Sequence, residues 1–366
     1  MNFSLTKLMF PSKEIIGIDI GSYAIKIVCF GEEKKQIKLK DWGYIPLAIK
    51  PDTPAEEKKA IIAQEIKDYL KKKGIQAKYV ATSVSGNSVI VRYVKLPKLW
   101  RELALSLNVE AEPYIPFDMK DVNLTYYILN DVMDEGQPKM DTVLVAAKKD
   151  IIKDKIDILS EAGLDPLIID VDSFALETLY DRVIPKTDNG AVLILNIGHK
   201  ATNLSIVSQG VTRVVRDIFI AGSTLNKAAQ KVLKADAAGI EALKRSKGLL
   251  VSDEDKEAAI ANMDSEGIAV SKVASGVLKE LYAEVSRSID FYLSQGVDHS
   301  IARILLSGGG ANLGNITKSM VNEFKVPVEI TNPFSFLPEQ KNIPKDILPT
   351  LAVAAGLALR RLKDWE

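Results

Sequence analysis

Apolar and polar residues alternate in three successive runs near the start of the chain, with glycines in the turns between them. This pattern predicts three strands within residues 15–46. The spacing then becomes helical over residues 54–73, where Ile62, Ile66 and Leu70 share one face. Three strands followed by a helix are typical of an α/β unit, in which helices cover a sheet.

The same rhythm begins again near the middle of the chain. Residues 192–220 predict three more strands with a tight second turn, a weak internal duplication of pattern rather than of sequence. A long helix is predicted near 268–295, and a helix of small residues closes the pattern at 350–359. A chain of 366 residues has the length of two domains, so the repeat predicts two related lobes.

Residues 78–148 have a different rhythm from both repeats. They predict a strand at 89–97, a helix at about 99–112, and strands at 122–130 and 141–147. We interpret them as a small α+β unit inserted into the first lobe, to which three further elements return. These elements are a helix at 149–161, a strand at 167–171 and a helix that starts near Asp172.

These patterns divide the chain into four parts, with a crossing between the lobes at 181–190. The parts are a first lobe (1–83 and 149–185), an inserted subdomain (84–148), the core of a second lobe (186–228 and 300–366) and an outer subdomain of that lobe (229–299).

The composition limits the function classes. Lys plus Arg and Asp plus Glu are balanced at 48 each, so charge gives no reason to expect nucleic acid as a partner. The single cysteine, Cys29, lies in an apolar run and is expected to be a buried strand residue. No stretch reaches the ~18 apolar residues of a membrane helix, and the N-terminus lacks a signal-peptide pattern. We therefore expect a cytoplasmic protein without a membrane span.

The first chemical signal is the turn Asp19-Ile-Gly21-Ser22, followed by Lys26, between two predicted strands. Glycine lets the backbone approach a phosphate closely, and the Ser22 hydroxyl can bind a phosphate oxygen. Lys26 can neutralise phosphate charge, and Asp19 can hold the water shell of a magnesium ion. Such a turn is also common in plain hairpins.

A second turn, Asn196-Ile-Gly198 followed by Thr202, occupies the same place in the second repeat. It offers another glycine and hydroxyl for phosphate. His199 in this turn has no visible catalytic partner and is expected to lie at the surface.

The third signal is a run of three glycines, Gly308, Gly309 and Gly310, directly after an apolar strand. Backbone without side chains can contact a flat group such as adenine, although a tight strand–helix turn needs the same residues.

The order and spacing of these turns resemble those of the actin, heat-shock chaperone, hexokinase and FtsA superfamily. The resemblance implies a two-lobed actin-like ATPase fold that binds ATP and magnesium between its lobes. Glu241 and Lys244 resemble the pair that grips the ribose in chaperone and FtsA relatives, although an ordinary i,i+3 ion pair looks the same. The closing helix, with Ala352, Ala355 and Gly356, resembles the second connecting helix of that fold.

The inserted unit resembles the strand-helix-strand-strand subdomain of FtsA-like proteins. Its run Glu110-Ala-Glu-Pro-Tyr114-Ile115-Pro-Phe117, with Asp121-Val122, is similar to a signature of the PilM family of type IV pilus assembly. That resemblance implies binding to the cytoplasmic N-terminal peptide of PilN in the inner-membrane alignment complex, and a link to the pilus motor ATPases. Tyr114, Ile115 and Phe117 are candidates for this contact, or else pack the insert onto the lobe.

One departure from the superfamily pattern concerns turnover. The second phosphate turn usually carries aspartate, and here it carries Asn196, so weak or absent ATPase activity is expected. Asp172, at the start of the connecting helix, matches the residue that orients the attacking water, or it caps the helix. A polymerising FtsA-like protein and a sugar kinase of the same fold, with Asp170 or Asp172 as its base, are the alternatives.

Overall fold

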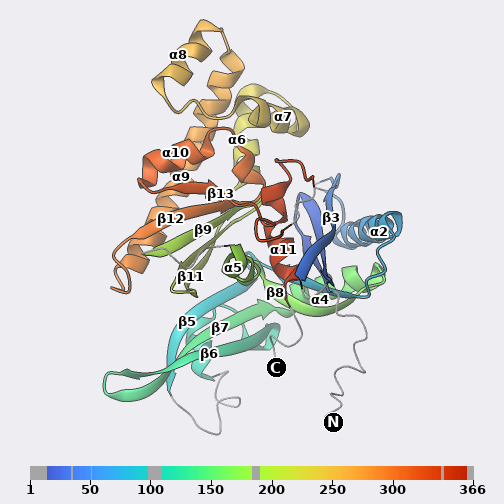
Figure 1. Ribbon diagram of the computed structural model, residues 1–366, viewed down its shortest axis with the longest axis vertical. Helices are drawn as coiled ribbons and strands as arrows, with labels where there is room; N and C mark the ends of the chain where they lie inside the picture. Colours follow the sequence, from blue (N-terminus) through green and yellow to red (C-terminus); the bar gives the residue numbers. More distant parts are fainter. Residues whose placement is uncertain are drawn as a thin grey trace.

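Three separate sheets make up the framework of the computed structural model (Figure 1). It describes residues 15–33, 36–50, 52–97, 109–183, 190–338 and 342–360. The predicted crossing at 181–190 lies mostly outside these residues. Among the described helices, none is long and apolar enough to cross a membrane.

The first sheet has the strand order β3-β2-β1-β4-β8. The first three strands form an antiparallel meander, whereas β4 and β8 run parallel to β1. Their bounds are β1 (Ile16–Ile20), β2 (Ala24–Glu33), β3 (Gln36–Pro46), β4 (Tyr79–Val84) and β8 (Asp165–Val171). The three predicted strands are confirmed, while β4 was not among the predicted elements.

Successive side chains of a strand point to opposite faces of the sheet, and in this sheet the apolar residues on both faces are buried. Helices therefore cover both faces. Helices α2 (Ala55–Lys73) and α4 (Lys149–Glu161) pack on the face that carries Ile16, Ile18 and Ile27. Helices α5 (Asp172–Val183) and α11 (Ala352–Ala358) pack on the opposite face.

The second sheet, β11-β10-β9-β12-β13, repeats this topology. An antiparallel meander is again joined to parallel strands, which confirms the duplication predicted from the pattern. The strands are β9 (Ala191–Ile197), β10 (Thr202–Ser208), β11 (Val211–Ile218), β12 (Ile301–Ser307) and β13 (Val328–Ile330). One face of this sheet shares the buried cluster of α5 and α11, which therefore lie between the two sheets (Figure 1).

The other face of the second sheet is covered by helices that lead to the far end of the molecule. The long helix α9 packs against the sheet, and α7 and α8 stand beyond it (Figure 1). The helices are α6 (Gly222–Leu233), α7 (Ala237–Lys247), α8 (Asp253–Ala261), α9 (Ser265–Leu293) and α10 (Ile316–Phe324). The predicted long helix near 268–295 is confirmed.

The third sheet, β5-β7-β6, is the inserted unit. Its strands are β5 (Val89–Pro97), β6 (Val122–Asp134) and β7 (Gln137–Lys148), with single 3-10 turns at Glu112–Tyr114 and Met119–Asp121. The predicted helix at about 99–112 lies mostly outside the described residues. The β6–β7 hairpin is longer than predicted, because Glu135 and Gly136 have φ values of 50° and 77° and form a tight turn.

The closing helix α11 sits unusually close to its neighbours because its residues are small. A Cβ atom added to Gly356 would lie 1.8 Å from the carbonyl oxygen of Ala175 in α5. One added to Gly17 in β1 would lie 2.1 Å from the carbonyl oxygen of Ala354. Helix α11 therefore meets β1 and α5 without space for larger side chains.

Candidate functional site

The first predicted phosphate turn joins β1 to β2. Asp19 and Lys26 are register partners on these strands, and the Lys26 Nζ atom lies 3.0 Å from Asp19 Oδ2. The Gly21 amide donates to the carbonyl of Ala24 at 3.2 Å, and a Cβ at Gly21 would lie 2.7 Å from Lys26 Nζ. Ser22 is exposed at the tip. The turn therefore presents a hydroxyl, with a paired cation directly behind it.

A second lysine reaches the same place from α4. Lys155 Nζ donates to the carbonyl of Ile20 at 3.0 Å. Burial lowers the pKa of Lys155, against the opposing effect of the Asp19 and Asp172 carboxylates. Lys155 was not among the predicted site residues, although it occupies the apolar stripe of α4 together with Ile151 and Leu159.

Asp172 begins α5 and faces the same group of charges. Burial is the main cause that raises its pKa to about 6, and the neighbouring Asp19 carboxylate adds to the effect. The hydroxyls of Ser83 and Ser85 hydrogen-bond to Asp172 and act in the opposite direction. Two carboxylates and two lysines thus gather where β1, β4 and α5 meet.

The second predicted turn joins β9 to β10. The Gly198 amide donates to the carbonyl of Ala201 at 2.9 Å, which closes the turn. Thr202 is fully buried, and its hydroxyl donates to the carbonyl of Ile220 at 2.7 Å. Asn196 donates from Nδ2 to Asn203 Oδ1 at 2.8 Å. In this structure Thr202 and Asn196 are engaged within the protein, and their place in nucleotide binding stays a prediction.

His199 joins the two turns across the lobes. Its ring lies 5.3 Å, centroid to centroid, from the ring of Tyr23 in the first turn. Burial is the main cause that lowers the pKa of His199, and the charges of Lys244 and Lys26 also lower it, against Glu241. His199 is partly buried rather than freely exposed, and Tyr23 of the other lobe lies beside its ring.

The three glycines after β12 have different surroundings. Gly308 has φ 82° and ψ 174°, and a Cβ there would lie 2.4 Å from the carbonyl oxygen of Ile197. A Cβ at Gly310 would lie 2.2 Å from Ile197 Cγ2. By contrast, a Cβ at Gly309 would meet no protein atom within 4 Å. Packing explains the first and third glycines, whereas the second presents bare backbone at an open position.

Glu241 and Lys244 form the predicted pair on α7, with their charged atoms 2.8 Å apart. A third residue, Asn226 of α6, completes the group by donating to Glu241 Oε1 and accepting from Lys244 Nζ, both at 2.8 Å. Burial acts to raise the pKa of Glu241, but Lys244 and Asn226 outweigh it and hold that pKa below its ordinary value. Sequence reasoning missed Asn226, because nothing in its neighbourhood along the chain points to α7.

The candidate partner residues of the insert separate into two kinds. Ile115 is only 7% exposed and belongs to the core of the insert, so it packs this subdomain. Phe117 is partly buried against the same core, with Lys148 Nζ 4.9 Å from its ring centroid. Tyr114 is 41% exposed. Of the three, Tyr114 is the one most accessible to a partner.

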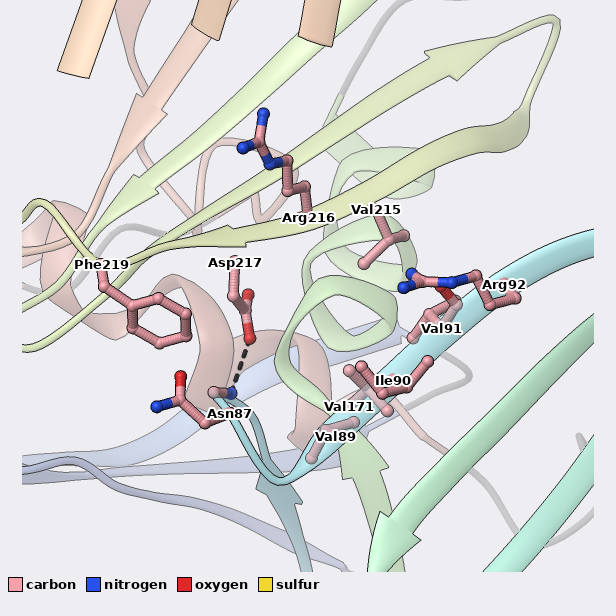
Figure 2. A pocket seen from close by; sticks show the side chains of 11 residues that line it. Asn87, Val89, Ile90, Val91, Arg92, Val171, Val215, Arg216, Asp217 and Phe219 are labelled. Atoms are coloured by element: carbon pink, nitrogen blue, oxygen red, sulfur yellow. Dashed lines mark hydrogen bonds between the residues drawn. The ribbon is translucent and has the colours of Figure 1, made fainter. Parts of the chain in front are cut away.

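A pocket of about 190 Å³ lies where the insert meets both lobes. Figure 2 shows residues of the β5 end, including Asn87 and Arg92, opposite Val215 and Phe219 at the end of β11. The Asp217 carboxylate links β11 to the segment before β5, because it accepts a hydrogen bond of 2.6 Å from the Gly86 amide (Figure 2). The insert is therefore in contact with the second lobe as well as the first.

Comparisons with known proteins agree with this architecture. The family model described as "Type IV pilus assembly protein PilM" matches residues 17–362. A chain in a structure of a PilM-PilN type IV pilus biogenesis complex is 27% identical, with a TM-score of 0.79, over 94% of this chain and 98% of that one.

More distant structures share the fold alone. EutJ, an ethanolamine utilization protein from Carboxydothermus hydrogenoformans, is 13% identical with a TM-score of 0.54, over 96% of this chain and 90% of its own. MreB5 of Spiroplasma citri, bound to ADP, is 14% identical with a TM-score of 0.53, over 94% and 95%. The predicted actin-like fold is confirmed, and the chain belongs to the type IV pilus assembly protein PilM family.

Proposed function

We propose that this protein is an ATP-binding component of type IV pilus assembly that binds the cytoplasmic N-terminal peptide of PilN. The observation that carries the proposal is the similarity to a chain of the PilM-PilN complex along nearly the whole length of both chains. A shared fold over the insert as well as the lobes supports a shared partner, since the insert is the part that distinguishes this branch.

Nucleotide binding is supported by the chemistry of the groups at the two turns, the glycine loop and α7. The Ser22 hydroxyl, Lys26 and Lys155 would face the phosphates, and Asp19 would hold a magnesium ion through water. Gly309 would lie against the base, and the Glu241–Lys244 pair beside the ribose. No cluster of three or more His, Cys, Asp or Glu residues suited to a metal occurs in the described ranges, so magnesium would depend on the phosphates for its remaining ligands.

Weak or absent hydrolysis fits the same arrangement. The Asn196 amide is neutral and is hydrogen-bonded to Asn203, so it adds no anionic group for a metal. Asp172, the candidate for orienting water, is engaged by the hydroxyls of Ser83 and Ser85, which compete with a water molecule for its carboxylate oxygens. We therefore propose that nucleotide acts here mainly as a bound effector.

The assembly role follows from the partner. A protein that grips the PilN peptide is recruited to the inner face of the inner membrane and joins the alignment complex to the pilus motor ATPases. The exposed Tyr114 is the proposed contact in the insert, because Ile115 beside it is committed to the core. An aromatic ring with a polar tip is a frequent anchor in such interfaces.

The experiment is a fluorescence anisotropy titration of the labelled N-terminal peptide of the cognate PilN. We expect saturable binding that Tyr114→Ala weakens about tenfold. Tyr127→Ala is the matched control, since Tyr127 is an exposed tyrosine of the same insert, and it should leave the affinity unchanged. Absence of peptide binding to the wild-type protein would overturn the proposed function, and equal effects of both variants would exclude Tyr114 as the contact.

A further inference from the structure

A continuous chain of side-chain hydrogen bonds runs from the glycine loop to the base of the insert. Ser307 Oγ donates to Asn196 Oδ1 at 3.3 Å, and Asn196 Nδ2 donates to Asn203 Oδ1 at 2.8 Å. Asn203 Nδ2 then donates to Asp217 Oδ1, also at 2.8 Å. The second oxygen of Asp217 accepts from the Gly86 amide at 2.6 Å (Figure 2). The chain of bonds thus begins beside the proposed nucleotide loop and ends at Gly86, where the insert begins.

The direction of every bond in this chain is fixed by Asp217. A carboxylate can only accept, so Asn203 must turn its NH₂ group towards Asp217 and its oxygen towards Asn196. Asn196 must then offer its own NH₂ group to Asn203. An aspartate at position 196 has no such donor, and Asn203 cannot flip to serve it without losing its bond to Asp217. Asn203 is buried, so an unmade bond there is costly.

The far end of the chain coincides with the point where the insert leaves the first lobe. Gly86 has φ 88° and lies between β4 and β5. The preceding residue, Ser85, hydrogen-bonds to Asp172 in the cleft. The Lys148 amide at the end of the insert donates to the Ser88 carbonyl at 2.9 Å, which ties both ends of the insert together. A movement of Gly86 therefore moves the attachment of the whole inserted sheet.

We propose that Asn196, Asn203 and Asp217 are positioning residues that couple the nucleotide cleft to the inserted, peptide-binding sheet. This inference rests on the proposed function. A nucleotide that shifts the β9–β10 turn carries Asp217 and Gly86 with it, so it changes the peptide affinity. Asparagine at position 196 is then the donor that this connection requires, and the departure from the superfamily aspartate is part of the coupling.

The test measures the coupling factor, which is the ratio of the peptide dissociation constants without and with saturating magnesium and a non-hydrolysable ATP analogue. We expect a ratio of roughly fivefold or more in either direction for the wild-type protein. Asn203→Asp places two acceptors face to face, and Asp217→Asn places donors face to face or releases Gly86. Each single variant should bring the ratio close to one while both ligands still bind.

The double variant N203D/D217N provides the decisive control. The new carboxylate at position 203 would accept both from Asn196 and from the new amide at position 217. The oxygen of that amide would still accept from Gly86, and the net charge would be unchanged. We expect the double variant to restore the coupling ratio, which a general loss of stability cannot explain. If Asn203→Asp alone fails to fold, recovery of folding and coupling in the double variant tests the same pairing.

The outcomes separate the two proposals. A wild-type protein that fails to bind the peptide, or fails to bind the nucleotide, overturns the proposed function. A wild-type protein that binds both with a ratio of one, or single variants that keep the wild-type ratio, overturns this inference and leaves the proposed function standing. A double variant that behaves like the singles also overturns the inference.

Discussion

Three neighbouring glycines lack side chains for different physical reasons. Gly308 adopts backbone angles that are almost confined to glycine, and Gly310 packs directly on Ile197. Gly309 is under neither constraint, since it has no positive φ and its Cβ position is open. The position beside Gly309 is therefore open to a ligand that approaches the backbone, as the proposed adenine contact requires.

The variant Gly309→Ala tests this difference. It should fold with wild-type stability, because a methyl group there meets no protein atom within 4 Å. It should weaken binding of a fluorescent ATP analogue by about tenfold, since the methyl group would hold the base away from the loop. Gly308→Ala is the contrast, with an expected loss of about 1–3 kcal/mol in unfolding free energy. Unchanged nucleotide affinity in Gly309→Ala would contradict the assignment of this loop.

Asp172 makes a prediction about pH. Its pKa of about 6 in the folded protein exceeds the value of about 3.9 expected when unfolded. Between these values the folded chain binds more protons, so the unfolding free energy falls as pH rises, and the penalty is complete above about pH 6. Asp172→Asn removes this dependence.

The measurement compares urea unfolding of wild type and Asp172→Asn at about pH 3, below both pKa values, and at about pH 7, above both. The stability of the variant relative to wild type should rise by roughly 2–3 kcal/mol between the two conditions, because about two pKa units are involved. Titrating groups that do not interact with Asp172 cancel in this difference. A relative stability that stays constant between the two conditions would show that the pKa of Asp172 is not perturbed.

At the scale of elements, helices α5 and α11 pack so closely that no larger side chain fits at their contact. The two helices lie between the two large sheets, and Gly356 leaves no space for a methyl group against Ala175. Gly356→Ala should therefore lower the unfolding free energy by about 3 kcal/mol. Gly276→Ala, in the interior of α9 where the added methyl group meets no atom, is the matched control and should raise it by about 0.5–1 kcal/mol. Chemical denaturation of both variants checks the pair, and similar losses in both would refute close packing at α11.

The elements that sequence reasoning predicted well have strong local signals. The meander strands and α2 show clear periodicity, and Gly74, with φ 66°, ends α2 where predicted. Strand β4 was missed because YVATSV is a short run that is buried between two parallel neighbours and does not alternate. The β6–β7 hairpin was predicted too short because both faces of its tip are exposed and the apolar pattern fades.

The part of the candidate site that lies in the turns was predictable from the sequence, whereas the part that helices supply was not. Asp19, Gly21, Asn196 and Gly308 are placed by turns that the sequence displays. Lys155 and Asn226 arrive from helices far along the chain, and only the tertiary arrangement brings them to their partners. The contrast between Ile115 and Tyr114 also required packing, because adjacent residues in a loop have no fixed periodicity.

At the scale of the whole molecule, the two lobes share the core around α5 and α11 and also meet near the two predicted phosphate turns. The rings of Tyr23 and His199 meet between the two turns, and Asp217 binds the Gly86 amide at the base of the insert. The second of these contacts involves the insert, so the proposed coupling has a physical route between the two sites. This arrangement predicts that nucleotide binding changes the affinity for the peptide, and peptide binding the affinity for the nucleotide, although the two sites are separate.

Nucleotide binding linked to peptide binding is tested most directly by titrating the purified protein with a fluorescent ATP analogue and magnesium, with and without the N-terminal PilN peptide. We expect saturable binding that unlabelled ATP displaces, and a change in nucleotide affinity with peptide equal to the change in peptide affinity with nucleotide. Absence of saturable nucleotide binding would contradict the proposal, because the glycine turns would then serve the fold alone.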